Sequence, residues 1–161
     1  TVLFGTARTE EREDKFLWVG PATPSNHGIF ARKADEHSFT DLDYLNDYRV
    51  ATIREDVAEE LTLAGGVQKS QLMRQSQTVP IIRALERGRA DFWAYNIQVG
   101  WHMLNKQNVA HKYEVVHTLR EGDNYIAVNP DSDPDTVQAL RDALAKVKAS
   151  GTYDNILDSY R

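Results

Sequence analysis

The sequence predicts an α/β fold with mainly parallel sheets, because short apolar strands alternate with helical segments along almost the whole chain. The clearest segment is a helix, a strand and a second helix over residues 78–106. Its strand, residues 89–96, is rich in aromatic residues and ends in the polar pair Tyr95 and Asn96. Because ligands of open α/β sheets bind at the carboxyl ends of strands, this pair is the first candidate site.

Two helices flank this strand. Residues 78–88 place Ile81, Ile82 and Leu85 on one helical face, and Gly88 can adopt the left-handed conformation that stops a helix. Residues 97–106 are the second helix, which begins directly after Asn96.

Further strands are expected where apolar and β-branched residues cluster. They are residues 1–6, 16–19, 28–32, 50–53, 70–73, 113–119 and 125–128. The dipeptide Gly20-Pro21 ends the second of these runs. Ser38 and Asp41 have the spacing of a capping box and open a short helix.

Helices are expected where a capping residue precedes apolar residues at helical spacing. Asp56 caps a helix that runs to residue 64, with Val57, Leu61 and Ala64 on its inner face.

Three further caps lie near the two ends of the chain. Asp133 is followed by Pro134, a good first helical residue, and the helix that they open ends at Gly151. Thr152 caps the last helix, and Thr9 caps a short helical turn after the first strand.

Composition excludes several classes of function. The 161 residues carry a net charge of −5 with no Lys/Arg-rich run, which argues against nucleic-acid binding. The absence of cysteine excludes disulfides, thiolate metal sites and cysteine nucleophiles. The five histidines lack metal-ligand spacing, and neither a Ser–His–Asp triad nor a phosphate-binding glycine loop can be read, so no metal or cofactor is expected. No run is long and apolar enough to span a membrane, and no signal peptide stands at Thr1.

Four stretches, in this order, resemble the extracytoplasmic solute-binding proteins of family 3, the substrate-binding type of amino-acid ABC transporters. The first resembles the ligand loop of the family, the second its crossover segment, the third the strand and helix of the second lobe's binding wall, and the fourth the closing segment of the first lobe. They are residues 5–12, 16–21, 50–61 and 125–160.

The resemblance implies a periplasmic-binding-protein-like fold with two lobes joined by crossover strands and a ligand in the cleft between them. Lobe 1 would comprise residues 1–24 and 119–161, and lobe 2 residues 25–118. The implied function is to bind a small polar or carboxylate-bearing solute, without catalysis or cofactor, in the periplasm or another extracytoplasmic space. The implied partners are that small-molecule solute and a membrane transporter permease.

The sequence departs from the family at its start, because the usual N-terminal part of lobe 1 has no counterpart here. The chain is therefore expected to be a fragment or a naturally shortened homologue. Its incomplete first lobe is expected to expose apolar faces and a sheet edge, which favours a homodimer or a domain-swapped oligomer.

Arg12 matches the arginine with which the family holds a ligand carboxylate, and a guanidinium suits that task because its paired donors fit a carboxylate. The alternative is a surface arginine that pairs with a neighbouring acid. Gly5, Thr6 and Ala7 match the loop that offers backbone groups and a hydroxyl, although Ala7 replaces a common hydroxyl residue. The alternative for Gly5 is simply to end a strand.

In lobe 2 the resemblance points to Arg54, Glu55 and Asp56 at the start of a helix, where Asp56 is alternatively a plain N-cap. Tyr95 could add an aromatic wall. Asn96 stands where amino-acid binders usually carry an aspartate that pairs with the ligand's ammonium, so an ordinary α-amino acid is not expected as ligand. The alternative for Asn96 is a cap for the following helix.

Two other functions stay open. Some dehydratases resemble this family, and an enzyme on the same scaffold would need Glu55 or Asp56 as its acid or base. A degenerate or sensory module would instead bind a partner, and the fold alone does not decide between these functions.

Overall fold

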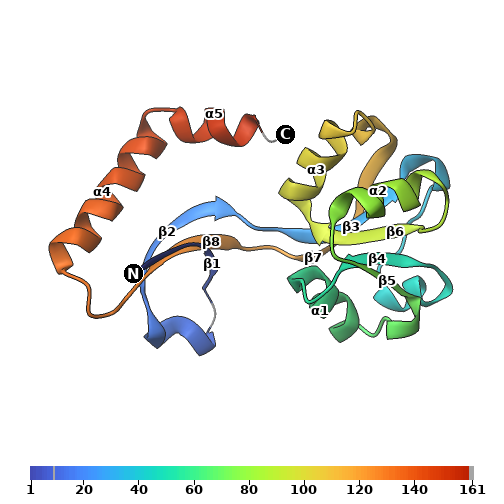
Figure 1. Cartoon of the computed structure of the whole chain (residues 1–161), viewed down its shortest axis with the longest axis horizontal. Coiled ribbons are helices and arrows are strands. Elements are labelled where there is room, and N and C mark those ends of the chain that lie inside the picture. Colours follow the sequence, from blue (N-terminus) through green and yellow to red (C-terminus); the bar gives the residue numbers. More distant parts are fainter. Residues whose placement is uncertain (9, 160–161) are drawn as a thin grey trace. The chain divides into compact units, whose positions relative to one another are not determined.

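The structure, a computed structural model, describes residues 1–8 and 10–159 and divides into two compact units (Figure 1). The first unit joins Thr1–Ser25 to Gly122–Arg161, and the second comprises Asn26–Glu121. The predicted cap at Thr9 lies outside the described residues. None of the helices in the described part of the chain is both long and apolar enough to cross a membrane.

The first unit contains a three-stranded antiparallel sheet in the order β1-β8-β2. Its strands are β1 (Val2–Ala7), β2 (Leu17–Pro24) and β8 (Asp123–Val128). Its helices are the 3₁₀ helix η1 (Glu10–Lys15), α4 (Pro134–Ala149) and α5 (Thr152–Asp158). Helix α4 packs Val137 on Val19, Ile126 and Val128, which form the small core of this unit.

Two local predictions for the first unit were wrong. Strand β2 does not end at Gly20-Pro21, because β8 continues to pair with it up to Pro24 beyond a bulge between Val19 and Thr23. The last helix is capped by Gly151 rather than Thr152, since Gly151 takes the left-handed conformation at the junction with α4.

The second unit contains a five-stranded sheet in the order β5-β4-β6-β3-β7. Its strands are β3 (His27–Arg32), β4 (Val50–Ile53), β5 (Leu72–Gln75), β6 (Phe92–Asn96) and β7 (Tyr113–Arg120). Its α-helices are α1 (Val57–Ala64), α2 (Thr78–Glu86) and α3 (Ile97–Lys106). Its 3₁₀ helices are η2 (Lys33–Asp35), η3 (Leu42–Asp47), η4 (Lys69–Gln71) and η5 (Ala110–Lys112).

The α/β class is confirmed, but the sheets are not mainly parallel: that of the first unit is antiparallel and that of the second is mixed. Among the described strands, β4 pairs in parallel with β5 and β6. Strand β3 lies antiparallel between β6 and β7. The alternation of strands and helices along a chain does not reveal such pairing, because it depends on contacts between distant segments.

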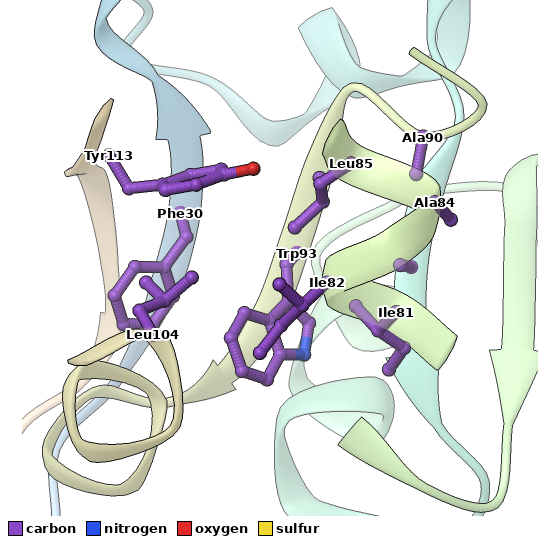
Figure 2. Packing of buried hydrophobic residues seen from close by; sticks show 10 residues of the cluster. Phe30, Ile81, Ile82, Ala84, Leu85, Ala90, Trp93, Leu104 and Tyr113 are labelled. Carbon is purple, nitrogen blue, oxygen red and sulfur yellow. The ribbon is translucent and has the colours of Figure 1, made fainter. Parts of the chain in front are cut away.

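Helices cover both faces of this sheet (Figure 1). Helices α2 and α3 pack on one face, where Ile82 and Leu85 are directed towards Trp93, in the same core cluster as Phe30 (Figure 2). Helix α1 packs on the other face, against residues of β3, β4 and β6. A Cβ atom at Gly100 of α3 would lie 2.6 Å from the Phe30 ring, so this helix approaches the sheet closely because position 100 is glycine.

Caps fix the helices of the second unit. Asp56 accepts a hydrogen bond from the Ala58 N–H at 2.9 Å, which confirms the predicted N-cap of α1. Helix η3 is capped by Asp41 and not by Ser38. The inner face of α1 was predicted wrongly: Ala58, Glu59 and Thr62 are buried there, whereas Val57 and Ala64 are exposed.

Candidate functional site

The carboxyl ends of the three parallel strands of the second unit meet at one edge of its sheet. Strand β4 leads there into the loop 54–56, and β5 ends beside it at Gln75. Strand β6 ends at the same edge with Tyr95 and Asn96. All five residues of this unit predicted to contact a ligand therefore lie along one edge, where ligands of α/β sheets bind.

The loop 54–56 presents side chains to solvent. Arg54 and Glu55 are exposed, whereas Asp56 is half-buried and its carboxylate is taken up by the N-terminus of α1. Glu55 adopts a left-handed conformation with φ of 59°, which is uncommon for a residue with a side chain. Of the two carboxylates that a dehydratase could use as its acid or base, Asp56 is engaged as a helix cap and Glu55 is exposed.

A buried ion pair under this loop was not foreseen in the sequence. Glu59 of α1 is 2% exposed, and its carboxylate accepts hydrogen bonds from Arg74 Nε at 2.9 Å and Arg74 Nη2 at 2.6 Å. The Thr52 hydroxyl donates to the same carboxylate at 2.6 Å. The hydrogen bond from Arg74 contributes most to lowering the pKa of Glu59 to about 2. The sequence signal that could have indicated this pair is an acidic residue in the first turn of α1, Glu59, followed along the chain by an arginine on strand β5, Arg74.

Tyr95 lies at the carboxyl end of β6, next to Asn96. Its ring stacks on that of Trp93, with centroids 4.9 Å apart and planes 15° from parallel. Burial, and to a smaller extent the charge of Asp56, raises the pKa of Tyr95. The aromatic pair therefore holds the ring of Tyr95 at the carboxyl end of β6.

Asn96 is the N-cap of α3. Its side-chain oxygen accepts a hydrogen bond from the Val99 N–H at 3.0 Å. This confirms the capping alternative that the sequence left open, and it places no negative charge at the end of β6.

The first unit places its predicted ligand residues on β1 and η1. Gly5 has φ of 68° within an irregular part of the pairing between β1 and β8, so it does not simply end the strand. Thr6 and Ala7 follow it in β1 and are half-buried. Arg12 lies in η1 and is exposed, and no other described side chain forms an ion pair with it.

Arg8, which the sequence did not single out, anchors η1 to the sheet. Its guanidinium forms an ion pair with Glu13. The same group lies 5.9 Å from the ring centroid of Trp18 and 5.5 Å from that of Tyr125. Hydrogen bonding to Glu13 raises the pKa of Arg8. Glu13 of η1 is thus paired with Arg8 and is not paired with Arg12.

Among the described side chains, those of residues 1–8, 10 and 12–159, no three of histidine, aspartate or glutamate come together as a metal site.

Comparison with known proteins identifies the fold. No protein-family profile matches the chain, and no curated protein sequence matches it. Solved structures match it over nearly its whole length. A mutant of ArgBP from T. maritima matches with a TM-score of 0.71 and 22% sequence identity, over 97% of this chain and 66% of that chain.

Two other structures match equally well. AbpA from Streptococcus pneumoniae, an amino acid ABC transporter substrate-binding protein bound to L-arginine, matches with a TM-score of 0.74 and 18% identity. The match covers 97% of this chain and 65% of AbpA. A histidine kinase sensor domain with similarity to periplasmic binding proteins matches with a TM-score of 0.72 and 22% identity, over 99% of this chain and 68% of that chain.

This protein therefore has the fold of the substrate-binding proteins of amino-acid ABC transporters, as the resemblance of its sequence predicted. It spans about two thirds of the length of the structures that it matches.

Proposed function

We propose that this chain, folded as a substrate-binding protein, binds a small polar or carboxylate-bearing solute outside the cytoplasm and delivers it to the permease of an ABC-type uptake system. The observation that carries the proposal is that 97% of the chain follows the fold of such proteins, with both units included. The exposed polar side chains at the sheet edge of the second unit lie where this class of fold binds ligands.

Arg12 is the proposed carboxylate ligand. It is exposed and forms no ion pair with another described side chain, so its guanidinium can donate paired hydrogen bonds to a solute carboxylate without first giving up such an ion pair.

The solute is proposed to lack the ammonium of an ordinary α-amino acid. The oxygen of Asn96 is engaged at the Val99 N–H, and no carboxylate stands at this position to balance an ammonium. We expect little thermal stabilisation of the wild-type protein by the common α-amino acids, and more by carboxylates without an ammonium group. A clear micromolar affinity of the wild type for an α-amino acid would contradict this assignment.

The matched variant is Asn96→Asp, which keeps the N-cap and adds the missing charge. We expect it to bind L-arginine roughly tenfold or more tightly than the wild type, because an ammonium held there gains a charged partner. Calorimetric titration of both proteins with L-arginine measures the difference.

A sensory role is the second candidate, because a histidine kinase sensor domain shares the fold over 99% of this chain. The two functions differ in their effect on a transporter, because the sensory alternative acts by binding a partner and delivers no solute to a permease. A transport component increases ATP hydrolysis by its permease complex in proteoliposomes when solute is present, whereas a sensory module leaves that rate unchanged.

Self-association is proposed through the first unit. Strand β1 is an edge strand on which Val2, Leu3 and Phe4 are all exposed, Phe4 by 74%. We expect light scattering to report a molar mass that rises from monomer towards dimer with concentration, and Phe4→Lys to shift this equilibrium towards the monomer. A monomer mass at every concentration in the wild type would overturn the proposal.

A further inference from the structure

The Glu59 carboxylate has four donors, and one of them belongs to the candidate ligand loop. Besides Arg74 and Thr52, the backbone N–H of Glu55 donates to Glu59 Oε1 at 3.1 Å. Glu59 is therefore the link between a buried ion pair and the exposed turn above it.

The three backbone N–H groups of the loop 54–56 are all engaged within the protein. The Arg54 N–H donates to the Gln75 carbonyl at 2.9 Å, and the Asp56 N–H donates to the Ile53 carbonyl at 3.3 Å. The Glu55 N–H, between them, is the one amide of the three that relies on a side chain. The loop thus offers a ligand its side chains and not its amides, unlike a helix N-terminus that binds an anion.

The central residue of this turn needs support. Glu55 holds a left-handed conformation that favours glycine, so the turn persists only if surrounding contacts compensate for the unfavourable backbone geometry. A hydrogen bond to a carboxylate is stronger than one between neutral groups, and Arg74 holds that carboxylate by donating one hydrogen bond to each of its oxygens.

We propose that Glu59 is a positioning residue that, through its hydrogen bond to the Glu55 N–H, holds the turn that presents the side chains of Arg54 and Glu55 to the solute. This inference rests on the proposed function, because it takes the loop 54–56 as part of a solute site. Glu59 itself is 2% exposed, so its proposed role is to position the turn and not to contact the solute. Arg74, whose side chain is 30% exposed, acts one step further away by orienting Glu59.

Native-state hydrogen exchange, followed by NMR on the full chain, tests the positioning role without any ligand. Glu59→Met preserves the length of the side chain and removes its acceptors. We expect exchange at the Glu55 amide to accelerate by roughly 10- to 100-fold, the factor for loss of one hydrogen bond to a charged group. The Leu61 amide, in the interior of α1, serves as the internal control for general destabilisation.

The exchange rates distinguish a local role of Glu59 at the turn from general destabilisation of the protein. A larger acceleration at Glu55 than at Leu61 supports the proposal, whereas equal factors at both amides, or an unchanged rate at Glu55, overturn it. If Glu59→Met does not fold, Arg74→Lys gives the same comparison, since lysine keeps the charge but cannot make two parallel hydrogen bonds to the carboxylate. A smaller acceleration confined to Glu55 is then expected.

A double variant tests whether the left-handed backbone at position 55 is the feature that Glu59 stabilises. Glycine at position 55 adopts the left-handed conformation without a side-chain penalty. The double variant Glu55→Gly, Glu59→Met should therefore keep the Asp56 amide as protected as it is in the wild type, whereas Glu59→Met alone should expose it. Equal exposure of that amide in both variants overturns the proposed mechanism.

Calorimetric titration with L-arginine and with glutarate measures whether Glu59 also affects solute binding. If the wild type binds either probe, we expect Glu59→Met to weaken that binding, and an unchanged affinity overturns the link between the turn and the site. If the wild type binds no solute at all, the proposed function fails, while the exchange result still decides whether Glu59 positions the turn.

Discussion

Replacing Glu59 by glutamine is expected to lower the free energy of unfolding by about 3 kcal/mol at neutral pH, the lower end of the range for a broken buried ion pair. The carboxylate loses its charge and one acceptor, while Arg74 keeps its charge beside it. The effect stays at the lower end because the side chain of Arg74 is 30% exposed and can turn towards water.

The same ion pair predicts a dependence of stability on pH. The pKa of Glu59 lies at about 2 in the folded protein, below the ordinary value of 4.5 that applies when the chain is unfolded. The folded state therefore binds this proton less readily, so the contribution of Glu59 is complete above about pH 4.5. This contribution to the free energy of unfolding is lost as the pH falls from 4.5 towards 2. The size of the pKa shift corresponds to about 3 kcal/mol.

Urea unfolding of wild type and Glu59→Gln between pH 7 and pH 2.5 measures both effects. The two stabilities should differ most at pH 7 and converge below pH 4.5. Glu60→Gln is the matched control, because Glu60 is the next residue of α1 and is exposed, so the change should stay within about 0.5 kcal/mol. A difference between wild type and Glu59→Gln that is constant down to pH 3 would contradict the assigned pKa.

Replacing Arg12 by alanine is expected to cost about 2–5 kcal/mol of solute binding, as for loss of one partner from a desolvated charge pair. The folded protein should be little affected, because Arg12 is exposed and pairs with no other described side chain. Calorimetric titration with the solute found in the screen gives the loss, and thermal unfolding without solute gives the control on folding.

Arg87→Ala is the matched control for the loss of one positive charge. Arg87 is exposed and follows α2, at the end of the sheet opposite to Asn96. Its removal should leave affinity within about twofold, since distant surface charges are screened by salt. Equal losses in both variants would mean that net charge, and not the guanidinium of Arg12, governs binding.

Local patterns predicted the elements that carry the candidate site. The bounds of β4, α1 and α3 agree with the sequence, because Asp56 and Asn96 are capping residues that stand between a β-branched or aromatic strand and a helix. The cap at Asn96 also shows why one residue carried two interpretations: capping and ligand contact both call for a polar side chain at the end of a strand.

Contacts between distant segments decided what local patterns missed. Helical spacing favoured Val57 and Ala64 as the inner face of α1, but the helix turns Glu59 inwards because Arg74, on another strand, neutralises its charge. Strand β2 continues beyond Gly20-Pro21 because β8 supplies a partner there. The spacing of residues within α1 or β2 gives no information about these partners, Arg74 and β8.

Native mass spectrometry of the purified protein tests the proposed solute binding most directly. We expect a population of the wild type that carries one small solute per chain, and a much smaller bound fraction for Arg12→Ala prepared in the same way. The Arg87→Ala variant should retain the wild-type fraction. A bare 18.3 kDa chain, with no bound solute as purified and none after incubation with millimolar mixtures of amino acids and carboxylates, would contradict the proposal that this protein binds a solute.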